Sequence, residues 1–159
     1  MAEEMVGVAM ASVGNSSKDK NWTASIEIDV PFYDVDMMAI VWHGHYIKYF
    51  ERARCELFNK IGYNYEDMRE SGYAWPVIDV HVRYAKPAKF QQKIIVTSTL
   101  LEFEQRLKLK YLIVDSVTGN RLTKGYTTQV AVDMKTQKMC YQSPNVLFEK
   151  LGVNPKRED

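Results

Sequence analysis

Two aspartates followed by a predicted helix start form the stretch of the sequence best suited to chemistry. The segment from Phe32 to Glu51 begins as extended chain, carries Asp34 and Asp36, and passes through a short apolar loop into a helix expected from about His43. The first turn of a helix leaves backbone N–H groups without an internal partner, and these groups stabilise negative charge that develops on oxygen. A carboxylate ahead of such a turn therefore indicates chemistry on a carbonyl group.

Each acidic residue of this stretch also has a structural interpretation. Asp36 could instead cap the helix or bind a loop amide. Asp34 would share a face with Asp36 in an extended chain and could raise the pKa of that neighbour by repulsion, but we expect it to be a solvated turn residue. For Glu51 on the helix, we favour a structural ion pair with Arg52 or Arg54 over a catalytic role.

Metal and cysteine chemistry are both disfavoured. His43 and His45, with His81, invite a zinc hypothesis, but a spacing of two residues at a helix start turns the imidazoles apart. Neither Cys55 nor Cys140 has a convincing base nearby, and the sequence contains no Gly-rich phosphate loop and no G-x-S-x-G motif. We predict no metal and no cofactor.

The elements that position this stretch can be predicted from periodicity. Residues 23–32 alternate as a half-buried strand that ends at Pro31. A long helix follows, closed by Gly62, with an apolar stripe at helical spacing. The residues of the stripe are Tyr46, Phe50, Ala53, Leu57 and Ile61. A short helix is expected between Asn64 as N-cap and Gly72.

The remainder of the chain is predicted as strands and one final helix. Alternating or β-branched segments cover Ile78–Tyr84, 94–103, 107–113 and Leu122–Met134, and a short helix follows Pro144. Short connections imply antiparallel pairing, and one helical stripe can cover one face of a five-stranded sheet. We predict an α+β domain, with the free sheet edge and second face covered by pairing into dimers or tetramers.

Length and composition describe an ordinary single domain. The 159 residues include 46% hydrophobic and 26% charged residues, and the net charge is +1. This balance argues against nucleic acid or an anionic membrane as the main partner. Two cysteines form no disulfide framework, which favours reduced thiols in a cytoplasmic protein. Residues 1–20 are predicted to be a disordered lead, residues 21–155 the domain, and no stretch is long and apolar enough to span a membrane.

The segment D-M-M-A-I-V-W-H-G-H-Y-I-K-Y-F-E-R-A-R resembles the signature of 4-hydroxybenzoyl-CoA-type thioesterases, especially the YbgC-like acyl-CoA thioesterases. The matching positions are Asp36, Ala39, Ile40, Val41, His43, Tyr46 and Glu51. Y-A-K-P-A-K-F at 84–90 also resembles a segment of this family, and the likeness extends from about residue 24 to 152. Val35 and Pro31 depart from the pattern, in which Thr or Cys and a basic residue are usual.

The resemblance implies a hotdog fold, in which an antiparallel sheet wraps around one long helix and active sites lie at a dimer interface. It implies hydrolysis of an acyl-CoA thioester to free acid and CoA. Asp36 would be the general base or a nucleophile that forms an anhydride, and the backbone N–H of His43 or Gly44 would polarise the carbonyl. The His43 side chain would line the acyl pocket or orient a water.

Substrate contacts can be proposed on the same basis. The phosphates of CoA require cations near the pocket mouth, and we favour Lys86 and Lys124 over Lys89 and Arg121. The aromatic residues Trp42, Tyr46 and Tyr49 could line an acyl channel, although core packing explains Tyr46 equally well. Two alternatives remain: a thioesterase that acts on acyl carrier protein, and an acyl-CoA-binding module without turnover.

Overall fold

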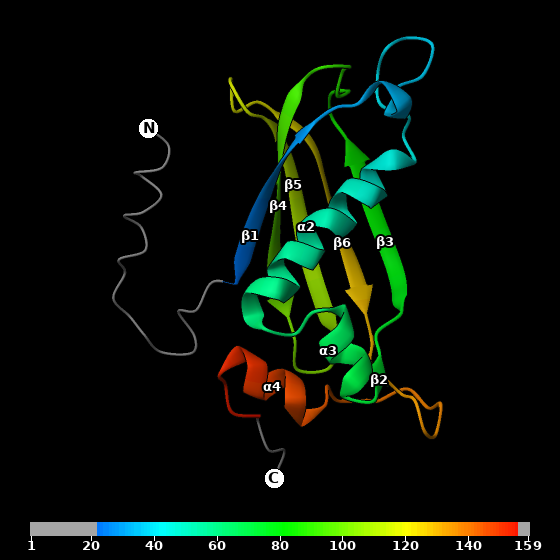
Figure 1. The fold of residues 1–159 in the computed structure, drawn as a ribbon, viewed down its shortest axis with the longest axis vertical. Coiled ribbons are helices and arrows are strands. Elements are labelled where there is room, and N and C mark those ends of the chain that lie inside the picture. The colour runs from blue at the N-terminus through cyan, green and yellow to red at the C-terminus, as the bar shows by residue number, and fades with distance from the viewer. Residues whose placement is uncertain (1–21, 156–159) are drawn as a thin grey trace, which may run out of the picture.

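A computed structural model describes residues 22–155, so the predicted lead at residues 1–20 lies outside the described part. One long helix, α2, crosses one face of a five-stranded sheet, and two short helices lie at one end of the molecule (Figure 1). The elements in chain order are β1 (Thr23–Asp29), η2 (Phe32–Asp34), α2 (His45–Ile61), α3 (Tyr65–Glu70), β2 (Tyr73–Ala74), β3 (Val77–Tyr84), β4 (Lys93–Glu102), β5 (Leu107–Asp115), β6 (Arg121–Gln129), β7 (Val132–Asp133) and α4 (Asn145–Leu151).

The main sheet is antiparallel throughout, in the order β1-β4-β5-β6-β3. Strands β4, β5 and β6 form a meander, since short turns favour pairing between consecutive strands. Strand β1 adds to one side of the meander and β3 to the other. The predicted α+β hotdog architecture, a five-stranded antiparallel sheet around one long helix, is confirmed.

Helix α2 packs through the predicted apolar stripe. Tyr46, Phe50, Ala53 and Leu57 are buried, and the ring of Phe50 stacks on Tyr111 of β5 with centroids 4.5 Å apart. At Gly125 of β6, an added Cβ would lie 2.7 Å from the Phe50 ring, so the missing side chain allows close approach of helix and sheet. Burying a ring of this size contributes about 2–3 kcal/mol to stability.

The ends of the helices follow the local sequence. Gly62 and Gly152 end α2 and α4 in the left-handed conformation, at φ 77° and 70°. Asn64 and Asp67 form a reciprocal capping box at the start of α3. None of the helices within residues 22–155 is long and apolar enough to cross a bilayer.

The prediction of one strand from Leu122 to Met134 is wrong. Strand β6 ends at Gln129, and β7 belongs to a separate two-stranded sheet with β2. The chain leaves the main ladder because the Val130 N–H donates to the carbonyl of Pro76, while the Gln129 side chain donates to the carbonyl of Trp75. An alternating pattern of side chains does not register such a change of backbone partner.

Strand β3 forms an exposed edge of the main sheet. Val77, Ile78, Val80 and Tyr84 are all exposed in the single chain. A free edge with apolar side chains is a surface that proteins ordinarily cover. The expected pairing into dimers or tetramers remains a prediction.

Candidate active site

The segment after η2 folds back on itself as a short closed loop. Val35 and Val41 form an antiparallel bridge, and the Asp36 N–H donates to the carbonyl of Ile40 at 2.8 Å. A turn closes the tip, where the Ala39 N–H donates to the carbonyl of Asp36 at 2.9 Å. The loop is therefore held by its own backbone, with Asp36 on its first arm.

A second set of contacts anchors the loop to the chain before β4. Ile40 bridges to Lys89, and the Val41 N–H donates to the carbonyl of Ala88 at 2.9 Å. Ala39 adopts φ 61°, which few residues other than glycine take up, and its carbonyl accepts from Phe90 at 3.0 Å. These bonds hold Ala39 in its unfavourable conformation.

The Asp36 carboxylate is exposed and uses its two oxygens differently. Oδ1 accepts the Met38 N–H at 2.8 Å and, more weakly, the Ile40 N–H at 3.5 Å. Oδ2 accepts no hydrogen bond from residues 22–155. Oδ1 of Asp36 thus binds loop amides, as the structural interpretation expected. Oδ2 remains available to accept a proton or to attack a carbonyl carbon.

The chain between the loop and α2 presents two adjacent N–H groups. Neither His43 nor Gly44 donates its backbone N–H to any group in the described part of the chain, whereas Trp42 on one side donates to Asp34 and His45 on the other donates to Trp42. Because helix α2 begins at His45, these groups lie at its positive end. They can stabilise an oxygen that gains negative charge.

The Trp42 side chain lies against Gly44 and the ring of His43. A Cβ added to Gly44 would clash with the Trp42 indole, so a larger residue there would displace the indole. The φ of −72° at Gly44 is ordinary. The indole also contacts the ring of His43, with centroids 4.8 Å apart, and is 49% exposed. Trp42 therefore forms a half-open apolar wall, a position that suits the predicted acyl contact.

The expectation that Asp34 is a solvated turn residue is wrong. Asp34 is 2% exposed and lies in a 3₁₀ turn, so it does not share an extended face with Asp36. Its carboxylate accepts from Lys48 Nζ at 2.7 Å and from the Tyr49 hydroxyl at 2.6 Å, and His45 Nε2 lies 3.9 Å away. The chain buries this carboxylate because helix α2 supplies a cation and a hydroxyl to it.

The same environment sets two pKa values. Burial alone would raise the pKa of Asp34, but the hydrogen bonds from Lys48 and Tyr49 and the positive charge of Lys48 outweigh it, so the pKa lies below its ordinary value. Burial, together with the hydrogen bond to Asp34, raises the pKa of Tyr49 far above its ordinary value. Asp34 is therefore an ionised anchor and Tyr49 a fixed hydrogen-bond donor.

Two tyrosines connect the site to the sheet. Tyr46 is buried at 2% exposure, and its hydroxyl accepts the Ala88 N–H at 3.0 Å, which places it in the core of the single chain rather than in an open channel. Tyr84, which the sequence did not single out, donates its hydroxyl to the carbonyl of His43 at 2.6 Å. Tyr84 and Tyr46 are in edge-to-face contact, 5.0 Å between centroids.

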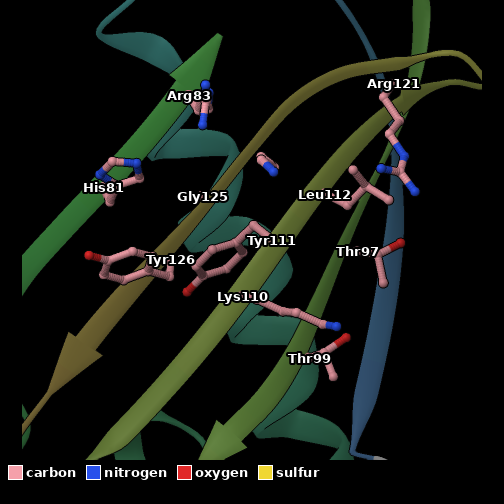
Figure 2. Close-up of a pocket in the computed structure, with 11 residues that line it drawn as sticks. His81, Arg83, Thr97, Thr99, Lys110, Tyr111, Leu112, Arg121, Gly125 and Tyr126 are labelled. Carbon is pink, nitrogen blue, oxygen red and sulfur yellow. The ribbon is translucent and has the colours of Figure 1, made fainter. Parts of the chain in front are cut away.

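The two lysines predicted to bind phosphate lie in different places. Lys124 lines a pocket together with Arg83, its cross-strand partner, and Arg121. Figure 2 labels Arg83 and Arg121 on the sheet face away from α2. Lys86 is exposed in the turn after β3, where its backbone N–H donates to the carbonyl of Leu122. Lys86 lines neither this pocket nor the neighbouring hollow that Lys124 also lines.

The remaining candidates fall outside the site. Glu51 pairs with Arg54 at 3.6 Å, as expected for a structural ion pair. His81 stacks on Tyr126 on the outer sheet face, with ring centroids 5.1 Å apart. Within residues 22–155, no three His, Cys, Asp or Glu side chains gather as metal ligands.

Comparisons with known proteins agree on one family. The family model described as "Thioesterase-like superfamily" matches residues 30–150. The Synechocystis protein named "Putative esterase sll0410" is 30% identical over 127 residues, which cover 79% of this chain and 76% of that protein. The acyl-CoA thioesterase YbgC of Haemophilus influenzae is 28% identical over 102 residues, 59% of this chain and 75% of that protein.

A solved structure gives the same assignment. The DHNA-CoA thioesterase of Staphylococcus aureus superposes with a TM-score of 0.69 at 29% identity, over 75% of this chain and 80% of that one. The resemblance seen at the aspartate-to-helix segment is thereby confirmed across the domain. The chain belongs to the thioesterase-like superfamily of hotdog-fold thioester hydrolases.

Proposed function

We propose that this protein hydrolyses an acyl-CoA thioester to the free acid and CoA, with Asp36 as the reacting carboxylate. The observation that carries the proposal is that one short loop holds Asp36 on its first arm and leads into the N–H groups of His43 and Gly44. Neither Asp36 Oδ2 nor these N–H groups form a hydrogen bond within residues 22–155. Relatives named as acyl-CoA thioesterases support CoA as the carrier of the acyl group.

The chemistry needs no group beyond these. As a base, Asp36 takes a proton from water, the hydroxide attacks the thioester carbon, and the C–S bond breaks to release CoA thiolate. As a nucleophile, Asp36 attacks the same carbon, expels the thiolate, and forms an anhydride that water then cleaves. In both routes the carbonyl oxygen becomes negative and accepts hydrogen bonds from His43 and Gly44, each contributing about 3–4 kcal/mol to the transition state. A thiolate with a pKa near that of free Cys, about 8.5, leaves without a strong acid.

The acyl group is proposed to lie along the apolar surface beside the loop. Phe32, Met37, Met38 and Trp42 are exposed around Asp36 in the single chain. An apolar surface of this kind serves a hydrophobic acyl chain, and it also fits a second copy of the chain that closes the site. We therefore propose a homodimer or a dimer of dimers as the active form.

Thiol release from a panel of acyl-CoA thioesters tests the proposal directly. We expect turnover of at least one chain length or aromatic acyl group, and loss of that turnover in Asp36→Ala. Full activity in Asp36→Ala would contradict the assignment of this carboxylate. Binding of acyl-CoA without thiol release would indicate a non-catalytic module, and activity confined to thioesters of acyl carrier protein would replace the proposed substrate.

A further inference from the structure

The sheet face opposite α2 carries a pocket whose charged lining is entirely basic. The pocket has a volume of about 600 Å³ and spans β3, β4, β5 and β6. Figure 2 shows the basic side chains of Arg83, Lys110 and Arg121 on the side of the strands away from α2. Tyr111 instead lines the pocket from the α2 side, where its ring stacks on Phe50. Its lining includes Arg83, Lys110, Arg121 and Lys124, and no acidic residue. Because the whole chain has a net charge of only +1, this is a local concentration of positive charge.

The sheet register places two of these cations directly opposite each other. Arg83 of β3 pairs with Lys124 of β6 across the strands. Like charges at such positions destabilise a sheet. Within residues 22–155, none of Arg83, Lys110, Arg121 and Lys124 forms an ion pair with a carboxylate. An anion bound between them would remove the repulsion that the chain otherwise leaves uncompensated.

A second hollow extends from this face to Tyr84, which contacts the candidate active site. It has a volume of about 300 Å³, shares Arg83, Leu112, Arg121 and Lys124 with the first pocket, and extends to Tyr84. Tyr84 donates its hydroxyl to the carbonyl of His43, next to the amides assigned to the thioester oxygen. This hollow therefore extends from the cations as far as Tyr84, and the Tyr84 hydroxyl is the contact that reaches the candidate active site.

We propose that this basic pocket binds the 3′-phosphorylated adenosine diphosphate end of CoA. Its phosphates lie on Arg83, Arg121 and Lys124, and the thioester-bearing arm passes Tyr84 to reach His43. The proposal rests on the proposed function, since it assigns a place to the carrier of that substrate. A second copy of the chain packed on this face would bring like charges together, and a hollow lined by cations suits phosphate groups better than a flat protein surface.

Binding of adenosine 3′,5′-bisphosphate to the full chain, measured by calorimetry, tests the site without any turnover. We expect binding to the wild type, and a Kd about tenfold weaker in Lys124→Thr. Without ligand, Lys124→Thr should unfold at the same or a higher temperature, because the repulsion from Arg83 is gone. A residue with a purely structural role would lower that temperature. Lys135→Thr, in the exposed turn after β7, makes the same charge change and should leave the Kd unaltered.

Kinetics separate this proposal from the proposed function. The wild type should prefer an acyl-CoA to the same acyl group on pantetheine, and Lys124→Thr should reduce that preference about tenfold. Equal turnover of both thioesters, with no binding of the bisphosphate, would overturn the nucleotide site and leave the thioesterase assignment standing. Binding of the bisphosphate without any turnover would support the site and overturn the proposed reaction. A change of oligomeric state in Lys124→Thr, with no change in Kd, would make this face a subunit interface and overturn the site.

Discussion

Asp34 and Asp36 stand two residues apart and have opposite surroundings. Asp34 is buried, its carboxylate is saturated by Lys48 and Tyr49, and its carbonyl holds the Trp42 N–H. Asp36 is exposed and leaves one oxygen unbound within the described residues. A carboxylate with a structural role has both oxygens hydrogen-bonded, whereas a carboxylate that reacts must keep one oxygen accessible.

The first aspartate positions the second. Asp34 joins the loop to helix α2 through its side chain and to Trp42 through its backbone, directly before His43 and Gly44. Asp34 is therefore a buried anchor that the Asp36 loop and the two amides share, in addition to the backbone bonds of the loop itself. Substitutions at the two aspartates should separate reactivity from stability.

The largest effect is expected from Asp36→Asn. The amide oxygen can still accept the Met38 N–H, so the loop persists, but the side chain no longer accepts a proton or attacks a carbonyl. We expect kcat to fall about 10³-fold, with the unfolding temperature within about 2 °C of the wild type. Thiol release and thermal unfolding measure the two quantities.

Asp29→Asn is the matched control, since Asp29 is an exposed aspartate at the end of β1. It should leave kcat within about twofold of the wild type. Retained turnover in Asp36→Asn together with a large loss of stability would assign Asp36 to the loop alone.

For Asp34→Asn we expect a loss of stability rather than a loss of the reacting group. An amide cannot accept from both Lys48 and Tyr49 as the carboxylate does, and the site is buried, so the free energy of unfolding should fall by about 2 kcal/mol. The loss is smaller than for a fully buried pair because Lys48 is 46% exposed and can reach water. Urea unfolding at pH 7 gives the value, and an unchanged midpoint would argue against the anchor.

The pKa of Asp34 predicts how this difference depends on pH. Because its folded pKa lies below the unfolded value of about 3.9, the ionised carboxylate stabilises the fold above that value. The contribution disappears as the pH falls through the folded pKa. The stability difference between wild type and Asp34→Asn should therefore be constant above about pH 5 and shrink below about pH 4. A difference that grew on acidification would contradict the sign of this shift.

A smaller loss is expected for Tyr49→Phe. The substitution removes one donor to Asp34 and keeps the buried ring and the Lys48 bond, so the free energy of unfolding should fall by about 1–1.5 kcal/mol. Tyr141→Phe, at an exposed tyrosine, is the control and should change stability by less than about 0.5 kcal/mol. Equal effects of the two substitutions would show that the Tyr49 hydroxyl adds nothing to the anchor.

Much of the fold was predictable because local periodicity and end signals agreed with it. The stripe from Tyr46 to Leu57, the glycine after α2 and the Asn64 cap all describe contacts within a few residues in sequence. The break between β6 and β7 was not predictable, because it depends on a backbone bond from Val130 to the distant Pro76.

Part of the candidate site was likewise predictable from the sequence, and part was not. Asp36 and the segment around His43 could be found from residue types and family resemblance. The burial of Asp34 could not, since its partners Lys48 and Tyr49 lie a full loop later and their orientation follows from where α2 begins. Lys124 and Arg121 were candidates for phosphate contacts from the sequence, but the position of Arg83 opposite Lys124 was not predictable, because it follows from strand register.

The smallest effect, opposite in sign, concerns the loop that carries Asp36. Ala39 is held at φ 61°, where a Cβ is unfavourable, so Ala39→Gly should raise the free energy of unfolding by about 0.5 kcal/mol after the larger entropy of unfolded glycine is subtracted. The same change at Ala24, in strand β1, should lower it by about 0.5–1 kcal/mol. Urea unfolding of both variants measures this contrast. If Ala39→Gly is stabilising and also lowers kcat, the strained alanine contributes to the placement of Asp36; if kcat is unchanged, the hydrogen bonds of the loop hold the carboxylate by themselves.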